Sequence, residues 1–283
     1  MTVSGDAGGW SRTVRWVGTY LASSIGRKQV LGVAGALLVA FLAGHMAGNL
    51  SLLNPDPAAA QAAYNAYCQF LTGLKPLIWF VEAGLAAILF VHVALALVLK
   101  LGNRRARGAA RYAVVSHAGQ ATGAAYTMFA SGAVILVFLV QHLVLFKFGR
   151  WYLYRNAAGE IVRDMWLTTV ETFANPVWTA LYVAALLVAG AHLVHALPSL
   201  FRTFGLVHPR WTPLLNAAGV CVAGAILGGF LVTAAGTCAL AHRPVTQAQI
   251  EKARAAQPAL EAQVAAQAPL AARLAAATEG VRK

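Results

Sequence analysis

Long runs of uncharged residues dominate the chain, and the charged residues gather in the shorter segments between them. The charge-free runs cover residues 29–55, 83–99, 112–146, 172–201 and 211–242. A helix needs about 20 apolar residues to cross a bilayer. Four of the runs have this length alone, and the second run reaches it when it starts near Leu77 and includes Glu82. The pattern therefore predicts an all-α integral membrane protein with five transmembrane helices, at about 30–53, 77–99, 120–146, 176–200 and 213–240.

Two of these predicted helices repeat one pattern that ends in a histidine. AGALLVAFLAGH (34–45) and SGAVILVFLVQH (131–142) share glycine, alanine, Phe-Leu and histidine at matching positions. The second and fourth predicted helices each carry a histidine too, so all of the first four have one inside an apolar run. The sequence therefore predicts a duplicated pair of helices, with a fifth helix added.

Composition agrees with a membrane protein. The chain is 59% hydrophobic and 11% charged, whereas a soluble domain has about 25% charged residues. The net charge of +13 could indicate nucleic-acid binding, but all 22 Lys and Arg residues lie outside the predicted helices. We therefore expect contact with membrane lipid and no nucleic-acid partner. The first apolar run is too long for the core of a cleavable signal peptide, so we expect it to be kept as the first span.

The basic residues also predict the orientation in the membrane. Residues 1–28 and the loop 100–118 are basic, which places them in the cytoplasm by the positive-inside rule. The loop 147–171 carries four basic and three acidic residues and is predicted outside. With five spans the C-terminus is also outside, although the tail that contains it is basic.

These boundaries divide the chain into three parts. A cytoplasmic N-terminal segment (1–28) precedes a transmembrane domain (29–242), and an Ala-rich tail on the outer face (243–283) follows it. Alanine and glutamine favour helix in the tail, with interruptions near Pro258 and Pro269. The alternative is a surface or disordered tail.

The four intramembrane histidines fall at two depths. Counted from the charged residues that flank each helix, His45 and His142 lie at an outer level, and His92 and His192 lie at an inner level. A rise of 1.5 Å per residue puts the levels roughly 12–20 Å apart. An ionisable residue in a membrane is costly without a partner, which makes it a functional hypothesis. For any single histidine, a hydrogen bond between helices is the alternative.

Two histidines from facing helices at one level are the axial ligands that a six-coordinate b-type haem requires. The pairs therefore predict two haems b in a four-helix bundle, with the fifth helix outside it. Haem propionates need cations or hydrogen-bond donors. At the inner level the candidates are Ser24, Arg27, Lys28, His195 and Arg202. The basic residues have an equal alternative role in topology and lipid binding, and His195 is an alternative ligand one turn from His192.

One acidic residue, Glu82, lies inside a predicted span, near the outer level. A carboxyl group in this position could exchange protons with a quinone. A structural hydrogen bond, or a position at the membrane interface, is the alternative. Asn49 and Trp79 are weaker candidates for the same outer site, because interfacial tryptophans are common in membrane proteins.

Several segments resemble one family. They are SSIGRK before the first helix, HMAGNL at its end, HVALALVLKLGNRRARGAARY, VETFANPVWTALY and HLVHALPSLFRTFGLVHPRWTP. In their order and spacing around the four histidines, they resemble the dihaem cytochrome b subunit of succinate dehydrogenase/fumarate reductase. This subunit is the five-helix single-chain membrane anchor of bacterial complex II. The resemblance covers about residues 21–240, and it departs from the family at Ala196, at Pro198 and in the tail.

The resemblance implies the same histidine pairing as the depths. His45 and His142 would ligate the outer haem, and His92 and His192 the inner one. It further implies a bacterial cytoplasmic membrane, with a flavoprotein subunit that oxidises succinate and an iron–sulfur subunit on the cytoplasmic face. The chain would be a subunit of succinate:quinone oxidoreductase, an enzyme of the tricarboxylic acid cycle, without binding succinate itself. Its electron carriers would be two haems b and menaquinone or ubiquinone, and the whole complex could form a higher oligomer.

Two alternative functions stay open at this point. One is a haem-free membrane anchor of the same complex. The other is a proton transporter with a histidine relay. A transporter favours more intramembrane acidic residues or interrupted helices, and the sequence pattern indicates neither.

Overall fold

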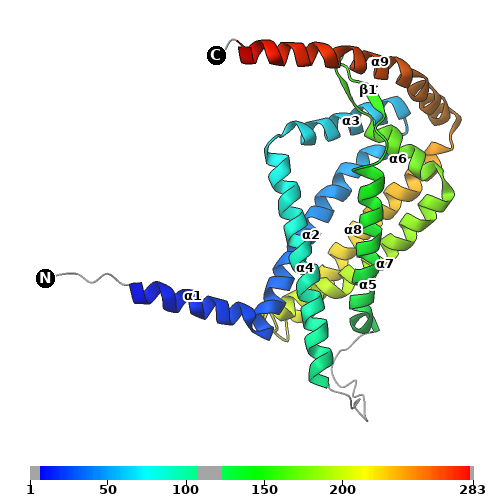
Figure 1. Ribbon diagram of the computed structural model, residues 1–283. Helices are drawn as coiled ribbons and strands as arrows, with labels where there is room; N and C mark the ends of the chain where they lie inside the picture. The colour runs from blue at the N-terminus through cyan, green and yellow to red at the C-terminus, as the bar shows by residue number, and fades with distance from the viewer. Residues whose placement is uncertain (1–6, 108–122, 281–283) are drawn as a thin grey trace. The chain divides into compact units, whose positions relative to one another are not determined.

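A computed structural model describes residues 7–107 and 123–280, with side chains for 13–106 and 127–267. The helices that Figure 1 labels are α1 (Ala7–Ala22), α2 (Ser24–Asn49), α3 (Pro57–Gly73), α4 (Leu77–Arg107), α5 (Gly123–Phe146), α6 (Met165–Ala174), α7 (Pro176–Thr203), α8 (Thr212–Ala241) and α9 (Pro244–Gly280). A 3-10 turn, η1 (Leu50–Leu53), follows α2. Arg111 of the basic loop and the predicted start of the third span at residue 120 lie outside the described residues.

Among the residues that the structure describes, five helices are long and apolar enough to cross a membrane, in agreement with the predicted number. They cover Ser24–Leu53, Leu77–Ala106, Thr127–Phe146, Pro176–Thr203 and Thr212–Ala241. Large apolar side chains on them are widely exposed, as Phe90 (73%), Val137 (71%) and Val177 (72%) illustrate. Exposed apolar surface of this extent indicates contact with lipid or with another protein. The chain is thus consistent with a multi-pass membrane protein.

The chain forms two compact units, and each of the five apolar helices contributes to both. Unit 1 contains Met1–Gly44, Trp79–Val134 and Val188–Ile226. Unit 2 contains His45–Ile78, Ile135–Leu187 and Leu227–Lys283. The predicted inner-level histidines, His92 and His192, therefore belong to unit 1. The outer-level histidines, His45 and His142, belong to unit 2.

The segment 147–175, between the third and fourth predicted spans, contains regular structure that the hydrophobic pattern does not indicate. Strands β1 (Leu153–Arg155) and β2 (Ile161–Arg163) form an antiparallel pair, and α6 follows directly. Strands of three residues are too short to show a clear alternation of apolar and polar positions. Arg163 joins this hairpin to α5, since its Nη2 donates to the carbonyl of Phe146 at 2.8 Å.

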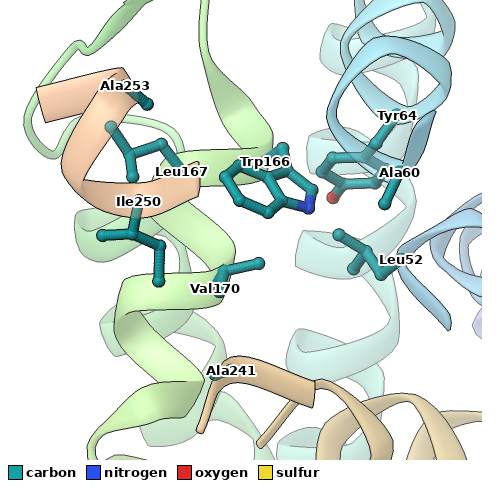
Figure 2. Packing of buried hydrophobic residues seen from close by; sticks show 9 residues of the cluster. All are labelled: Leu52, Ala60, Tyr64, Trp166, Leu167, Val170, Ala241, Ile250 and Ala253. Atoms are coloured by element: carbon teal, nitrogen blue, oxygen red, sulfur yellow. The ribbon is translucent and has the colours of Figure 1, made fainter. Parts of the chain in front are cut away.

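In unit 2, η1, α3, the hairpin, α6 and the first half of α9 form a small folded region, here called the cap. Its core is a cluster of buried apolar residues: Leu52, Ala60, Tyr64, Trp166, Leu167, Val170, Ala241, Ile250 and Ala253. Figure 2 shows the Trp166 ring at the centre of this cluster, with Tyr64 of α3 on one side and Ile250 of α9 on the other. The cap thus has an apolar core of its own, which joins the ends of two apolar helices at Leu52 and Ala241.

A buried carboxylate connects α3 to the start of α6. Asp164 is the N-cap of α6, and its Oδ1 accepts a hydrogen bond from the backbone N–H of Leu167 at 3.0 Å. The same side chain accepts from Gln61 Nε2 at 2.5 Å and Asn65 Nδ2 at 2.8 Å. Asn65 Oδ1 accepts in turn from the backbone N–H of Trp166 at 3.0 Å. These bonds satisfy the free donors at the N-terminus of α6.

The tail folds as helix α9, and its first half packs against the other elements of the cap. Gln257 pairs with the edge of β1, accepting from the backbone N–H of Leu153 at 2.7 Å and donating to its carbonyl at 2.9 Å. Arg254 forms an ion pair with Glu171 of α6, with 2.5 Å between Nε and Oε1. The helix continues through Pro258, where the sequence predicts an interruption. Packing and side-chain bonds to the cap stabilise the helix on either side of this proline.

Candidate functional site

His45 of α2 and His142 of α5 lie side by side in unit 2. Their ring centroids are 5.9 Å apart, and the ring planes are nearly perpendicular, at 83°. Phe230 of α8 contacts the His45 ring, with centroids 5.7 Å apart. The outer-level pair that the sequence predicts is therefore brought together by the fold.

Aromatic side chains surround His142. The centroids of Phe146, Phe138 and Tyr182 lie 5.1, 6.0 and 6.1 Å from its ring. Tyr182, on α7, is 4% exposed and also packs against Phe173 of α6. Its hydroxyl lies 3.3 Å from Nδ1 of His142. This shell is apolar except for one hydroxyl directed at one ring nitrogen.

The inner-level pair lies in unit 1. His92 of α4 and His192 of α7 are close enough to interact electrostatically. Nδ1 of His192 lies 3.0 Å from Oγ of Ser131 on α5. The Ser131 hydroxyl donates to the carbonyl of Met128 at 3.0 Å, so its oxygen is oriented to accept from the ring N–H of His192. Nδ1 of His92 is buried and has no hydrogen-bond partner within the described part of the chain.

A glycine lies against each ring of the inner pair. A Cβ atom added to Gly35 of α2 would lie 3.3 Å from Cε1 of His92. One added to Gly132 of α5 would lie 3.5 Å from Cε1 of His192. A larger side chain at Gly35 would displace the His92 ring. Backbone that approaches both rings this closely gives each imidazole a defined position.

The two hydroxyl contacts follow a crossed pattern. The histidine on α5 meets a tyrosine of α7, and the histidine on α7 meets a serine of α5. Neither Tyr182 nor Ser131 was identified from the sequence. A signal was present, because Ser131 precedes His142, and Tyr182 precedes His192, by about three helical turns. Ser131 and His142 thus lie on the same face of α5, whereas Tyr182 and His192 lie about a quarter turn apart around α7.

Two predicted propionate partners line one pocket in unit 1. The pocket has a volume of about 280 Å³, and its lining residues are Ile25, Lys28, Ser199, Arg202 and Thr203. Two cations and two hydroxyl groups make it suitable for an anionic group.

The other predicted propionate partners do not line this pocket. Ser24 is exposed and Arg27 is partly buried. His195, one turn after His192, is partly buried and interacts electrostatically with Arg202. Lys28 and Arg202 are therefore the members of the predicted set that lie together.

The predicted quinone-site residues are divided between the units. Asn49, in unit 2, accepts a hydrogen bond from the Tyr64 hydroxyl at 3.1 Å. Trp79 and Glu82 belong to unit 1; Trp79 is 60% exposed, and Glu82 is also exposed. This arrangement does not define a quinone pocket, and the three residues stay candidates.

The donor set of each histidine pair fits haem better than a bare metal ion. Among the described residues, no group of three or more His, Cys, Asp or Glu side chains is placed to hold a metal. A tetrahedral zinc site needs more protein ligands than two imidazoles, whereas haem iron needs only the two axial ones. His45 and His142, with adjacent rings, would be the residues that hold one such group, and His92 and His192 the residues that hold the other.

The hydroxyl contacts support the same interpretation. A histidine that binds a metal through one ring nitrogen usually donates a hydrogen bond from the other. Tyr182 and Ser131 both contact Nδ1, which leaves Nε2 of His142 and His192 for the metal. The residues at both pairs are therefore compatible with haem.

Comparisons of the chain with protein-family models, curated proteins and solved structures find no match. A functional assignment therefore depends on the chain's own residues. These are two pairs of histidines within apolar helices, a hydroxyl beside one histidine of each pair, and a cationic pocket.

Proposed function

We propose that this chain is the dihaem cytochrome b membrane anchor of a succinate:quinone oxidoreductase. The observation that carries the proposal is the pairing of four intramembrane histidines, with each pair contained in one compact unit. The depths of the histidines along the sequence give the same pairs independently. The family resemblance of the segments around them favours complex II over other dihaem proteins.

In this proposal, His45 and His142 hold one haem b, and His92 and His192 hold the other. Bound haem supplies a one-electron carrier that needs no proton. The chain positions the four imidazoles, excludes water with the apolar shell around His142, and neutralises propionate charge with Lys28 and Arg202. Tyr182 and Ser131 fix the orientation of two of the ligand rings. Electrons then pass between an iron–sulfur subunit on one side and membrane quinone on the other.

The proposed location follows from the family resemblance and from the distribution of basic residues. The protein lies in a bacterial cytoplasmic membrane, with the N-terminus inside and the cap outside. Flavoprotein and iron–sulfur subunits dock on the cytoplasmic face, near the basic ends of the spans. Quinone, either menaquinone or ubiquinone, exchanges near the outer haem, with Glu82, Trp79 and Asn49 as candidate contacts.

A visible spectrum of the purified protein tests the haem part of the proposal. We expect a b-type α band in the reduced-minus-oxidised spectrum and two haems per chain by the pyridine haemochrome assay. His142→Ala should remove one haem and leave the inner one. His208→Ala is the matched control, because His208 is exposed in the connection between α7 and α8, and it should keep both haems. Absence of an α band from the wild type would overturn the proposal and favour a haem-free anchor or a histidine relay.

Reduction by succinate tests membership of the complex. The assay requires co-expression with the neighbouring flavoprotein and iron–sulfur subunits and purification of the assembly. Succinate should then reduce haem in the assembly and not in the isolated chain. A dihaem protein that never co-purifies with such subunits would keep the haem assignment and overturn the assignment to complex II.

A further inference from the structure

Helix α1 exposes a row of apolar side chains in front of the first span. Val14, Val17 and Leu21 recur at intervals of three and four residues, which places them on one face. They are 65%, 40% and 46% exposed. Trp16 and Tyr20 stack with ring centroids 5.8 Å apart and are exposed as well. At 100° per residue Trp16 lies on a different face from this row and Tyr20 lies at its side, so the continuous apolar strip consists of Val14, Val17 and Leu21. An exposed apolar strip of this kind marks an interaction site.

The charged side chains of α1 and α2 are all basic. From the start of α1 at Ala7 to the end of α2 at Asn49, the chain contains no acidic residue. Arg15 of α1 is exposed, on a different face from the apolar row. Arg27 and Lys28 follow at the start of α2. An apolar face beside basic residues is typical of helices that lie on an anionic membrane surface.

A fixed elbow separates α1 from α2. The Ser23 hydroxyl donates to the carbonyl of Tyr20 at 2.6 Å and accepts from the backbone N–H of Gly26 at 3.0 Å. The Tyr20 carbonyl occupies the space that a side chain at position 26 would need, so only glycine fits there. The Tyr20 hydroxyl also donates to Gln29 Oε1 of α2. These contacts hold α1 in a direction that does not continue the axis of α2.

We infer that α1 lies on the membrane surface and binds anionic phospholipid. The candidate span begins at Ser24, one residue after the elbow, so the C-terminal end of α1 lies at the depth of the lipid head groups. There, Val14, Val17 and Leu21 enter the apolar boundary, while Arg15 meets lipid phosphate. Trp16 and Tyr20 have the amphipathic rings that prefer this interface. The inference requires α2 to cross the membrane, but it does not depend on haem or on complex II.

Spin labels on opposite faces of α1 test the inference in the full chain. Cys68, Cys221 and Cys238 are first replaced by serine, and single cysteines are then introduced by Val17→Cys or Thr19→Cys. Each labelled protein is reconstituted in vesicles of phosphatidylcholine and phosphatidylglycerol. We expect the oxygen-to-nickel accessibility ratio to be several-fold higher for the label at position 17. A label introduced by Val137→Cys, on the lipid-exposed face of α5, serves as the reference for correct insertion.

Arg15→Gln tests whether α1 binds anionic lipid through this basic side chain. This substitution should reduce the difference between positions 17 and 19 in anionic vesicles and leave it unchanged in vesicles of phosphatidylcholine alone. High nickel accessibility at both positions would place α1 in water and overturn the inference. Protection of both positions from both reagents would indicate that protein, and not lipid, covers the helix. No effect of Arg15→Gln in anionic vesicles would overturn the phospholipid contact.

Discussion

The hydroxyl oxygen of Tyr182 lies 3.3 Å from Nδ1 of His142. This contact leaves Nε2 as the nitrogen that can bind a metal. Ser131 contacts His192 in the same way, with the two partner helices exchanged. A hydrogen bond from the second ring nitrogen makes a histidine ligand more basic and fixes its orientation. In the proposed dihaem protein, the two hydroxyls would therefore give each histidine pair a separate means of adjusting its haem.

Tyr182→Phe should raise the reduction potential of the outer haem. Removing the acceptor makes the His142 ring a weaker electron donor, which stabilises the oxidised iron less. A neutral hydrogen bond contributes about 0.5–1.5 kcal/mol, which corresponds to about 20–60 mV for a one-electron carrier. A potentiometric titration followed at the α band measures this shift for each haem.

Tyr152→Phe is the matched control for that experiment. The Tyr152 hydroxyl donates to Glu171 in the cap, at 2.6 Å, so its loss should leave both potentials unchanged. The inner potential should also stay constant in Tyr182→Phe. Equal shifts in both haems would indicate a general structural change, and an unchanged outer potential would show that the contact has no electronic effect.

Gly35→Val should displace the inner haem. The nearest atom to an added Cβ is Cε1 of His92, at 3.3 Å, and the further methyl groups of valine need the space of that ring. We expect the haem content to fall from two per chain toward one, with the outer haem retained. Gly224→Val on α8 is the control, because nothing lies within 4 Å of an added Cβ there. Two haems per chain in Gly35→Val would contradict the close packing of α2 against His92.

The sequence pattern predicts the apolar helices well because each one is long and free of charge. It also predicts the histidine pairs, since depth in the membrane can be counted from flanking charges. The pattern predicts the starts of the helices less well. Helix α2 begins at Ser24, whereas the apolar run predicts a start at about residue 30. Polar residues such as Arg27 and Lys28 can extend a helix beyond its apolar part, and hydrophobicity does not register them.

The cap could not be predicted in the same way. Its core joins Trp166, Tyr64 and Ile250, which lie on three segments far apart in the sequence. The hydrogen bonds of Gln257 to β1 and of Asp164 to α3 depend on the same long-range packing. A single apolar residue such as Ile250 in an Ala-rich tail does not indicate which other segment it will contact. The helical propensity of the tail was evident, but its docking was not.

Ile250→Ala should loosen α9 from the cap. Ile250 is 2% exposed, and replacing a buried isoleucine by alanine costs about 2–5 kcal/mol. Hydrogen exchange of the backbone amides in α9 and α6 should therefore become faster. Val264→Ala is the control on the same helix, because Val264 is 42% exposed and its loss should change stability by less than about 0.5 kcal/mol. Equal exchange in both variants would mean that the cap does not hold α9.

The stability of the cap should decrease as the pH rises through the acidic range. Asp164 is 0% exposed, and burial raises its pKa above the ordinary value, although the hydrogen bonds from Leu167, Asn65 and Gln61 oppose the rise. Between the ordinary and the raised pKa, the folded cap binds more protons than the unfolded chain. Linkage then makes the free energy of unfolding fall with rising pH in this window and level off above it.

Hydrogen exchange of the cap amides, measured from about pH 4 to 7 and corrected for intrinsic rates, reports this free energy. Asp164→Asn cannot titrate, and subtracting its values removes the contribution of every other ionisable group. The wild-type-minus-variant difference in free energy should fall with rising pH in the acidic part of the range and become constant above it. A difference that rises with pH would mean that the hydrogen bonds stabilise the charged carboxylate more than burial destabilises it. A flat difference would mean that folding does not shift the pKa of Asp164, so that the folded and unfolded states bind the same number of protons at this residue.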